Sequence, residues 1–137
     1  MRESWLSEIR VAGEHAEERP AKFRVDVEPE REVVRVCPIG EVDLGTVGHV
    51  RAKLDELRSS GFSRVILDLR GTTFLDSSGL RLAVEVNADS ANDGLAFGII
   101  AGPPEVQRAF ELAGLDARLP FVRARPGGDG RAPVYES

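Results

Sequence analysis

The fold of this chain is decided by the stretch VILDLRGTTFLDSSGL, residues 65–80. Its first five residues are mostly apolar and follow the turn signal at residues 60–61, so they predict a buried strand. Residues 71–73 interrupt that strand, and Phe74 and Leu75 are expected to return to the core. Residues 76–78 then precede apolar positions at helical spacing, which are Leu80, Leu82, Ala83, Val84 and Val86. The Asp-Ser-Ser group is therefore predicted to stand at the N-terminus of a helix.

A helix N-terminus has unpaired N–H groups and a partial positive charge. A serine there would present its hydroxyl where a modifying enzyme can reach it. Gly79, which has no Cβ, would let another chain or a phosphate approach the first turn. The simpler alternative is that Asp76, Ser77 and Ser78 only cap the helix. The physics of a helix terminus does not choose between the two serines as a site of modification.

Residues 75–80, LDSSGL, resemble the signature of anti-sigma factor antagonists, which are single-domain members of the STAS family. Residues 40–43, GEVD, resemble the family's Gly-Glu-Leu-Asp turn after the second strand, and Thr46 falls at the start of the first helix. The third helix and its exit are matched by Pro104, Val106, Phe110, Gly114 and Leu115. The resemblance covers roughly residues 22–124. It implies the fold of the family, a single STAS-like α/β domain.

The resemblance implies a function without catalysis. In the family the first serine after the aspartate is phosphorylated, which corresponds to Ser77. The unmodified protein would bind an anti-sigma factor that is also its serine kinase, and so free a sigma factor. Phosphorylation would release the partner, and a serine phosphatase would reset the protein. The residues expected to contact the partner are Glu41, Asp43, Thr46, Asp76, Ser77, Ser78, Gly79 and Arg81.

The rest of the chain alternates strands and helices. Strands are expected at residues 23–27, 33–39, 65–69, 95–100 and 119–122, and helices at 46–59, from 77 onward, and at 104–113. This order predicts a mixed, mostly parallel sheet after a first hairpin, with helices packed against it. Thr46 is predicted to cap its helix. Pro38 should lie at a strand end, edge or bulge, because it lacks a ladder donor.

The two ends of the chain differ from this pattern. Residues 1–21 are polar, although Ser4, Trp5, Leu6, Ile9 and Ala12 could form a short helix with one apolar stripe. They form either a partly ordered extension or a segment whose Trp5 docks on the domain or on a partner. From residue 125 onward the Gly- and Pro-rich sequence predicts a flexible tail.

Composition excludes several classes of function. The chain has 137 residues, 42% hydrophobic and 30% charged, which is typical of one ordinary globular domain. A net charge of −5 with scattered arginines argues against nucleic acid or a membrane surface as partner. No apolar run approaches the ~20 residues of a membrane span and no signal peptide is evident, so a cytoplasmic location is expected. A single cysteine, Cys37, and two distant histidines, His15 and His49, predict neither a metal site nor a disulfide, and no cofactor motif is present.

Two alternatives to the antagonist are weighed. Ser77, His49 and Asp43 could be imagined as a hydrolase triad, but the chain has no Gly-x-Ser-x-Gly elbow, so it is not expected to be an enzyme. A STAS scaffold module of a larger sensory or transporter-associated complex would associate to high order, whereas the antagonist would be a monomer or weak dimer. On the helix after Ser77, Arg81 and Glu85 are spaced to form an exposed pair.

Overall fold

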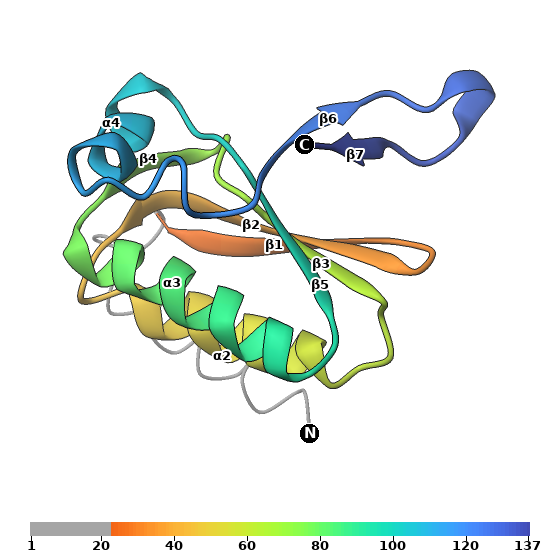
Figure 1. Cartoon of the computed structure of the whole chain (residues 1–137), viewed down its shortest axis with the longest axis horizontal. Coiled ribbons are helices and arrows are strands. Elements are labelled where there is room, and N and C mark those ends of the chain that lie inside the picture. The colour runs from red at the N-terminus through yellow and green to blue at the C-terminus, as the bar shows by residue number, and fades with distance from the viewer. Residues whose placement is uncertain (1–22) are drawn as a thin grey trace.

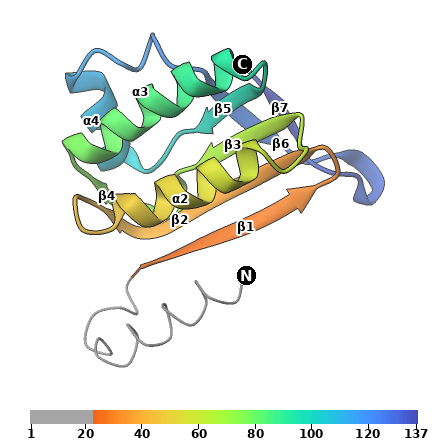
Figure 2. The same ribbon diagram turned by 90° about the horizontal axis from the view of Figure 1, so that it is seen from below.

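The computed structural model describes residues 23–137. They form a mixed seven-stranded sheet with two helices, α2 and α3, side by side on one face (Figures 1 and 2). The elements are β1 (Arg24–Glu30), β2 (Val33–Val42), α2 (Val47–Arg58), β3 (Arg64–Asp68), β4 (Thr72–Leu75), α3 (Ser77–Asn92), β5 (Ala96–Ile100), α4 (Pro104–Leu112), β6 (Phe121–Arg125), the 3₁₀ turn η3 (Gly128–Gly130) and β7 (Val134–Glu136). The predicted α/β class is confirmed. The N-terminal extension expected at residues 1–21 lies outside the described residues.

The strand order is β1-β2-β3-β5-β6-β7. The short strand β4 lies off this path and pairs with β2 farther along that strand than β3 does. The pairs β1/β2 and β6/β7 are antiparallel, and the other pairs are parallel. The long strand β2 pairs with β3 over residues 33–36 and with β4 over residues 40–42. Its carboxyl end therefore points into the loop before α2, next to the place where β4 passes into α3.

Pro38 lies inside β2, not at a strand end or edge; of the three positions expected for it, only a bulge is near, since the pairing of β2 with β4 shifts register between Gly40 and Glu41. Its carbonyl oxygen accepts a hydrogen bond from the Thr72 hydroxyl at 2.9 Å, so this side of Pro38 faces the interval between β3 and β4. In a strand the N–H and C=O of one residue point to the same side. The N–H that Pro38 lacks would therefore point into the interval between β3 and β4, where no neighbouring strand pairs with β2. The strand can continue through Pro38 for this reason.

The main core lies between the sheet and the helices. Its helical side chains are buried at the predicted spacing and are Val50, Leu54, Leu57, Leu82, Ala83, Val86, Val106 and Phe110. Burying such a side chain fully contributes about 1.5–3 kcal/mol, so these faces hold the helices on the sheet. Leu112 is 76% exposed at the end of α4. Leu115 takes the inward position and packs against the core.

The stretch after β3 differs from expectation. Residues 72–75 form the strand β4, in which Thr72 and Leu75 are buried. Phe74, expected in the core, is 48% exposed, because the strand pattern turns its side chain outward while Leu75 points inward. The helix α4 lies against this strand (Figure 1).

The C-terminal residues also differ from expectation, since they form a strand instead of a flexible tail. β7 pairs with β6, and Tyr135 is buried against Ile66, Ile100 and Val122. The Tyr135 hydroxyl donates a hydrogen bond to Glu30 Oε1 at 2.6 Å. Side chains alternate along β3, so this second cluster lies on the sheet face opposite the main core. Within residues 23–137, none of the helices has the length and apolar character needed to cross a membrane.

Candidate functional site

The first turn of α3 is built by Asp76, as the sequence predicts. Asp76 has an extended backbone and is the N-cap of the helix. Its Oδ1 accepts hydrogen bonds from the N–H of Ser78 at 2.9 Å and of Gly79 at 3.4 Å, and also from the Ser78 hydroxyl. Two of the unpaired N–H groups of the helix start are thereby satisfied by one carboxylate.

The same carboxylate ties α3 to the loop before α2. Asp76 Oδ2 accepts a hydrogen bond from the Leu44 N–H at 3.2 Å, and the Asp76 N–H donates to the carbonyl of Val42 at 3.2 Å. The hydrogen bonds from Ser78, Gly79 and Leu44 together lower the pKa of Asp76 below its ordinary value. Asp76 is therefore ionised at neutral pH, and it holds the two loops together as a negative charge.

The two serines differ in their surroundings. Ser77 is the first residue of α3, is exposed, and makes no side-chain hydrogen bond with any residue from 23 to 137. Ser78 is half-buried, and its hydroxyl donates to Asp76. Of the two hydroxyls, that of Ser77 is the one left without a bond to the described residues.

The loop before α2 is fixed by Asp43 and Thr46, but not in the way the sequence predicts. Thr46 holds the N-cap position, yet its side chain makes no capping hydrogen bond to the helix. Its hydroxyl donates to the carbonyl of Glu41 at 2.7 Å and accepts from the Asp43 N–H at 3.0 Å. Asp43 Oδ1 accepts the N–H groups of Gly45 at 2.9 Å and Thr46 at 3.1 Å. Asp43 is thus the side chain that closes the turn, and Glu41 remains exposed.

Gly79 does not have the role that the sequence suggested. It is buried, and a Cβ there would meet Leu75 Cγ at 2.7 Å and Val42 Cγ1 at 3.2 Å. The missing side chain therefore lets α3 pack closely on β2 and β4. It does not open the helix start to another chain.

The expected pair between Arg81 and Glu85 is absent. Glu85 instead forms an ion pair with Arg51 of the neighbouring helix α2. Arg81 is exposed and has no ion-pair partner in the described part of the chain. Its guanidinium is available at the surface one turn after Ser77.

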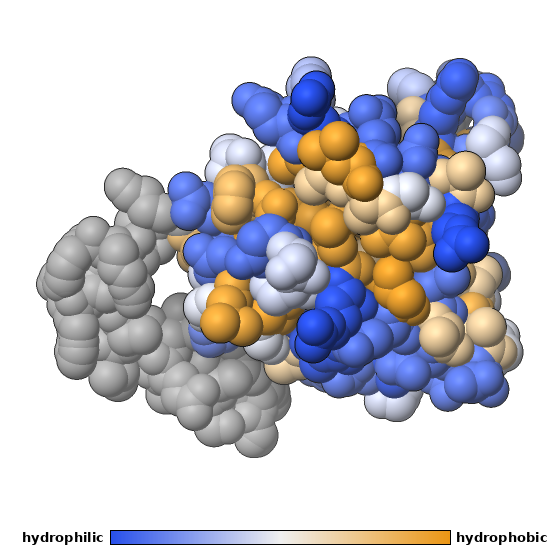
Figure 3. Space-filling view, turned by 60° about the vertical axis from the view of Figure 1, so that its left-hand side comes forward, coloured by the Kyte–Doolittle hydropathy of each residue, from blue (hydrophilic) through white to orange (hydrophobic). Residues whose placement is uncertain are grey.

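Exposed apolar side chains flank the Asp76–Ser77 turn, and sequence reasoning missed them. Leu44 is 80% exposed in the loop tied to Asp76, and Phe74 is 48% exposed two residues before Asp76. Figure 3 shows hydrophobic side chains gathered on the face that includes this end of the molecule. The sequence did contain one sign of these exposed apolar side chains, namely a leucine between Asp43 and Gly45 in an otherwise polar turn. We name Leu44 and Phe74 the apolar flank.

The described residues contain no grouping of the three or more His, Cys, Asp or Glu side chains that a metal ion would need. No hydrogen bond within residues 23–137 connects Ser77, His49 and Asp43. His49 is exposed, with its ring 6.3 Å from that of Phe23. The arrangement at the start of α3 therefore consists of a free hydroxyl, a fixed carboxylate and apolar side chains.

Comparison with known proteins agrees with this fold. The family model of the STAS domain matches residues 24–125. An anti-sigma factor antagonist from Mycobacterium paratuberculosis, known from a crystal structure, has 25% sequence identity to this chain and a TM-score of 0.66. The match covers 74% of this chain and 86% of that one. The anti-sigma factor antagonist SpoIIAA in its unphosphorylated form is 24% identical, with a TM-score of 0.59 and coverage of 72% and 86%.

The Bacillus cell fate determinant SpoIIAA in its phosphorylated form is 22% identical, with a TM-score of 0.55 and coverage of 72% of this chain and 89% of that one. These likenesses support the fold described above. The family match spans well over half of the chain and includes both the Asp43 loop and the start of α3. The chain therefore belongs to the STAS domain family.

Proposed function

We propose that this protein is an anti-sigma factor antagonist whose binding is switched off by phosphorylation of Ser77. Membership of the STAS family and the likeness to the Mycobacterium paratuberculosis antagonist support the class of function. The observation that carries the proposal is the Ser77 hydroxyl, which is exposed at the first residue of α3 and free of hydrogen bonds to the described residues.

The local geometry favours Ser77 over Ser78 as the modified residue. A kinase must reach the hydroxyl and remove its proton, and the hydroxyl of Ser77 is exposed. The Ser78 hydroxyl is half-buried and already donates to Asp76. A phosphate on Ser78 would replace that donor with negative charge beside an ionised carboxylate, which is unfavourable.

A phosphate on Ser77 would not unfold the domain. It adds about −1.5 to −2 charges at neutral pH. Negative charge at a helix N-terminus is favourable by about 0.3–1 kcal/mol when exposed, and repulsion from Asp76 offsets part of this. The change in the free energy of unfolding is therefore small.

Binding responds differently, because a partner would cover the serine together with the apolar flank. Leu44, whose N–H is bonded to Asp76, and Phe74, three residues before Ser77 in the sequence, offer exposed apolar area. A partner that buries them would also take the phosphate out of water, next to Asp76. Burying an unpaired charge costs several kcal/mol, whereas 1.4 kcal/mol already changes affinity tenfold.

The partner in this proposal is a cytoplasmic anti-sigma factor with serine kinase activity, which the unmodified protein binds so that a sigma factor is released. A serine phosphatase would restore the unmodified state. The proposed contact surface comprises Glu41, Asp43, Thr46, Asp76, Ser77, Ser78 and Arg81, with Gly79 packed beneath it. The protein acts by binding and carries no catalytic step.

Capture from a lysate of the source organism tests the switch. We expect the immobilised Ser77→Ala variant to retain an ATP-binding serine kinase, because alanine keeps the surface neutral and cannot be phosphorylated. The Ser77→Asp variant should retain at least about tenfold less, since its charge must be desolvated. Ser59→Asp, which adds the same charge at the exposed C-terminal end of α2, is the matched control and should capture as much as the wild type, and circular dichroism checks that every variant is folded. Equal capture by Ser77→Asp and the wild type would contradict the proposal.

Mass spectrometry tests the site itself. After incubation with ATP and the captured kinase, we expect phosphate on Ser77 in the wild type and in Ser78→Ala. No phosphate should be found in Ser77→Ala. Phosphate on Ser78 in the wild type would show that accessibility of the hydroxyl does not select the site.

A further inference from the structure

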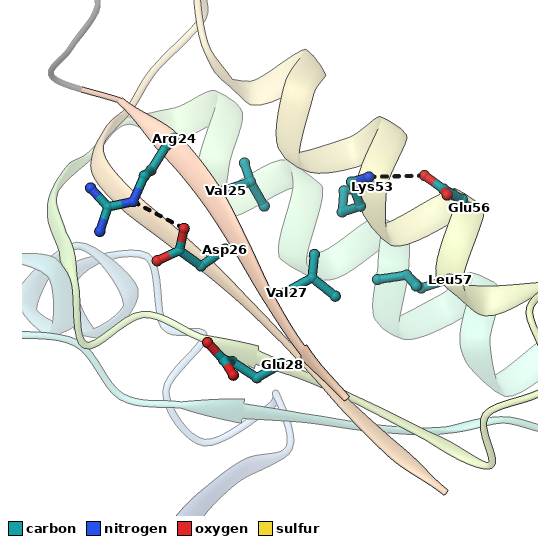
Figure 4. A pocket seen from close by; sticks show the side chains of 8 residues that line it. All are labelled: Arg24, Val25, Asp26, Val27, Glu28, Lys53, Glu56 and Leu57. Atoms are coloured by element: carbon teal, nitrogen blue, oxygen red, sulfur yellow. Dashed lines mark hydrogen bonds and ion pairs between the residues drawn. The ribbon is translucent and has the colours of Figure 1, made fainter. Parts of the chain in front are cut away.

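A groove lies between the edge strand β1 and the helix α2. It has a volume of about 660 Å³. Its lining consists of residues 24–28 of β1 and of Lys53, Glu56 and Leu57 of α2. Figure 4 shows Val25 and Val27 pointing from β1 toward Lys53 and Leu57, whereas Arg24, Asp26 and Glu28 point to the other side of the strand. The groove thus has an apolar floor, and its rim is charged.

No described residue covers the groove from outside. β1 pairs only with β2 within residues 23–137, so its outer edge is unpaired there. Val25 and Val27 are only half-buried, although both pack against the core on their inner side. An apolar floor with a polar rim beside an open strand edge is typical of a docking surface.

The chain itself supplies a segment that fits this surface. The 22 residues before Phe23 precede β1 directly in the sequence, and Arg24 at the start of β1 lines the groove. In a helix over residues 4–12, the side chains of Trp5, Ile9 and Ala12 recur at i, i+4 and i+7 and share one face, with Leu6 at its border. Val11 falls on the opposite face.

The lengths agree as well. A helix over residues 4–12 is about 13–14 Å long at 1.5 Å per residue. Residues 24–28 of β1, which form one wall of the groove, span roughly 16–17 Å. The connection over residues 13–22 reaches up to ~33 Å, and Gly13 and Pro20 favour turns within it, so the helix can fold back along β1.

We propose that residues 4–12 form a helix that docks its Trp5, Ile9 and Ala12 face into the groove between β1 and α2 of the same chain. Tethering through ten residues gives an effective concentration on the order of millimolar, so the chain's own segment outcompetes a second copy at ordinary protein concentrations. Docking would bury Trp5 and shield the open edge of the sheet. The inference does not depend on the function proposed for Ser77.

Trp5 is the only tryptophan of the 137-residue chain, so its fluorescence reports docking directly when all of these residues are present. We expect the emission of the folded wild type to lie at a shorter wavelength than that of the urea-unfolded chain, with acrylamide quenching at least about twofold weaker. Both signals should stay constant over a hundredfold dilution. Emission equal to that of the unfolded chain would overturn the proposal, and so would loss of the shift on dilution, which would indicate docking on a second copy.

Matched variants locate the contact. Ile9→Asp on the docking face should shift Trp5 to the solvent-exposed signal, whereas Val11→Asp on the opposite face should not. Val27→Asp in the groove should have the same effect as Ile9→Asp, and Val134→Asp, on the exposed strand β7, should have none. Because residue 9 lies outside the described domain, Ile9→Asp remains informative even if Val27→Asp fails to fold. A Trp5 signal that is unchanged by Ile9→Asp would overturn the proposal.

Discussion

At the scale of single residues, the two serines show how adjacent side chains acquire different roles. Ser78 completes the hydrogen-bonding arrangement around Asp76, whereas the Ser77 side chain has no hydrogen bond to any residue from 23 to 137. The two serines differ because the Asp76 carboxylate lies over the first turn of α3 and accepts a hydrogen bond from the Ser78 hydroxyl. A hydroxyl that contributes nothing to the fold can be modified at little cost to stability.

Asp76 should be more important to stability than either serine. We expect Asp76→Ala to lower the free energy of unfolding by about 1–2 kcal/mol, because it removes the helix cap and the bond to the Leu44 N–H. Asp76→Asn keeps an oxygen acceptor and should cost only a fraction of that. Urea denaturation of both variants measures the difference, and equal stability of Asp76→Ala and the wild type would show that the cap is dispensable.

The cap at Asp76 could be predicted from the sequence, because an Asp-Ser-Ser group before a helical repeat is a local signal. The role of Asp43 was harder to predict. Asp43 and Thr46 are both good capping residues, and the pattern alone assigns the cap to the one at the helix boundary. The structure shows Thr46 bonded back to the Glu41 carbonyl, a contact that depends on how the loop leaves β2.

At the scale of elements, α3 depends on the absence of a side chain at Gly79. We expect Gly79→Ala to destabilise the protein by about 1–3 kcal/mol, because its Cβ would meet Leu75 at 2.7 Å and Val42 at 3.2 Å. Gly48 provides the matched control, since it lies in the first turn of α2 and a Cβ there meets nothing within 4 Å. Gly48→Ala should be neutral or stabilise by up to about 1 kcal/mol.

Thermal or urea unfolding of the two alanine variants makes the comparison. Similar changes in both would mean that Gly79 contributes only through helix propensity. A loss confined to Gly79→Ala would support close packing of α3 on β2 and β4.

The helices and the long strands were predictable because their apolar periodicity is local. The strand β4 was not, since its four residues carry no clear alternation, and its pairing with β2 depends on β2 extending beyond Pro38. Phe74 was misplaced for the same reason: an aromatic residue after a strand is normally buried, and only the register with Glu41 turns it outward. The free hydroxyl at Ser77 could be anticipated, but the exposed Leu44 beside it could not be inferred from periodicity.

At the scale of the whole molecule, a polar cluster holds the sheet face opposite the main core. Asp68 is buried, and burial alone would raise its pKa, but hydrogen bonds from Arg70 and Arg35 outweigh burial and hold the pKa below its ordinary value. Arg35 also bonds Glu30, which in turn accepts the Tyr135 hydroxyl. The last strand is thereby connected to the first hairpin, a contact between residues 105 apart that no local pattern predicts.

Tyr135 should report this connection during titration with alkali. Burial and the hydrogen bond to Glu30 raise the pKa of Tyr135 from 10.0 to about 12. A raised pKa means that the folded state favours the neutral phenol, so the contribution to stability is complete below pH 10 and is lost as the pH rises toward 12. Tyr135 is the only tyrosine, so tyrosinate absorbance follows it alone.

We expect a midpoint near pH 12 in the folded protein and a lower midpoint in Glu30→Gln, which removes the carboxylate but leaves the burial. Tyr135→Phe should lose about 1.5–3 kcal/mol at neutral pH, the range for a hydrogen bond to a charged group. A midpoint near pH 10 in the folded wild type would mean that Tyr135 is not buried against Ile66, Ile100 and Val122.

The proposed function depends most on one effect: a phosphate on Ser77 weakens binding of the partner while the domain stays folded. Titration calorimetry of the purified anti-sigma factor against the unmodified protein and its Ser77 phosphoprotein tests it most directly, with circular dichroism on both. We predict at least about tenfold weaker binding of the phosphoprotein, equivalent to about 1.4 kcal/mol or more, and unchanged secondary structure. Equal affinity of the two forms, or loss of binding through unfolding of the phosphoprotein, would contradict the account.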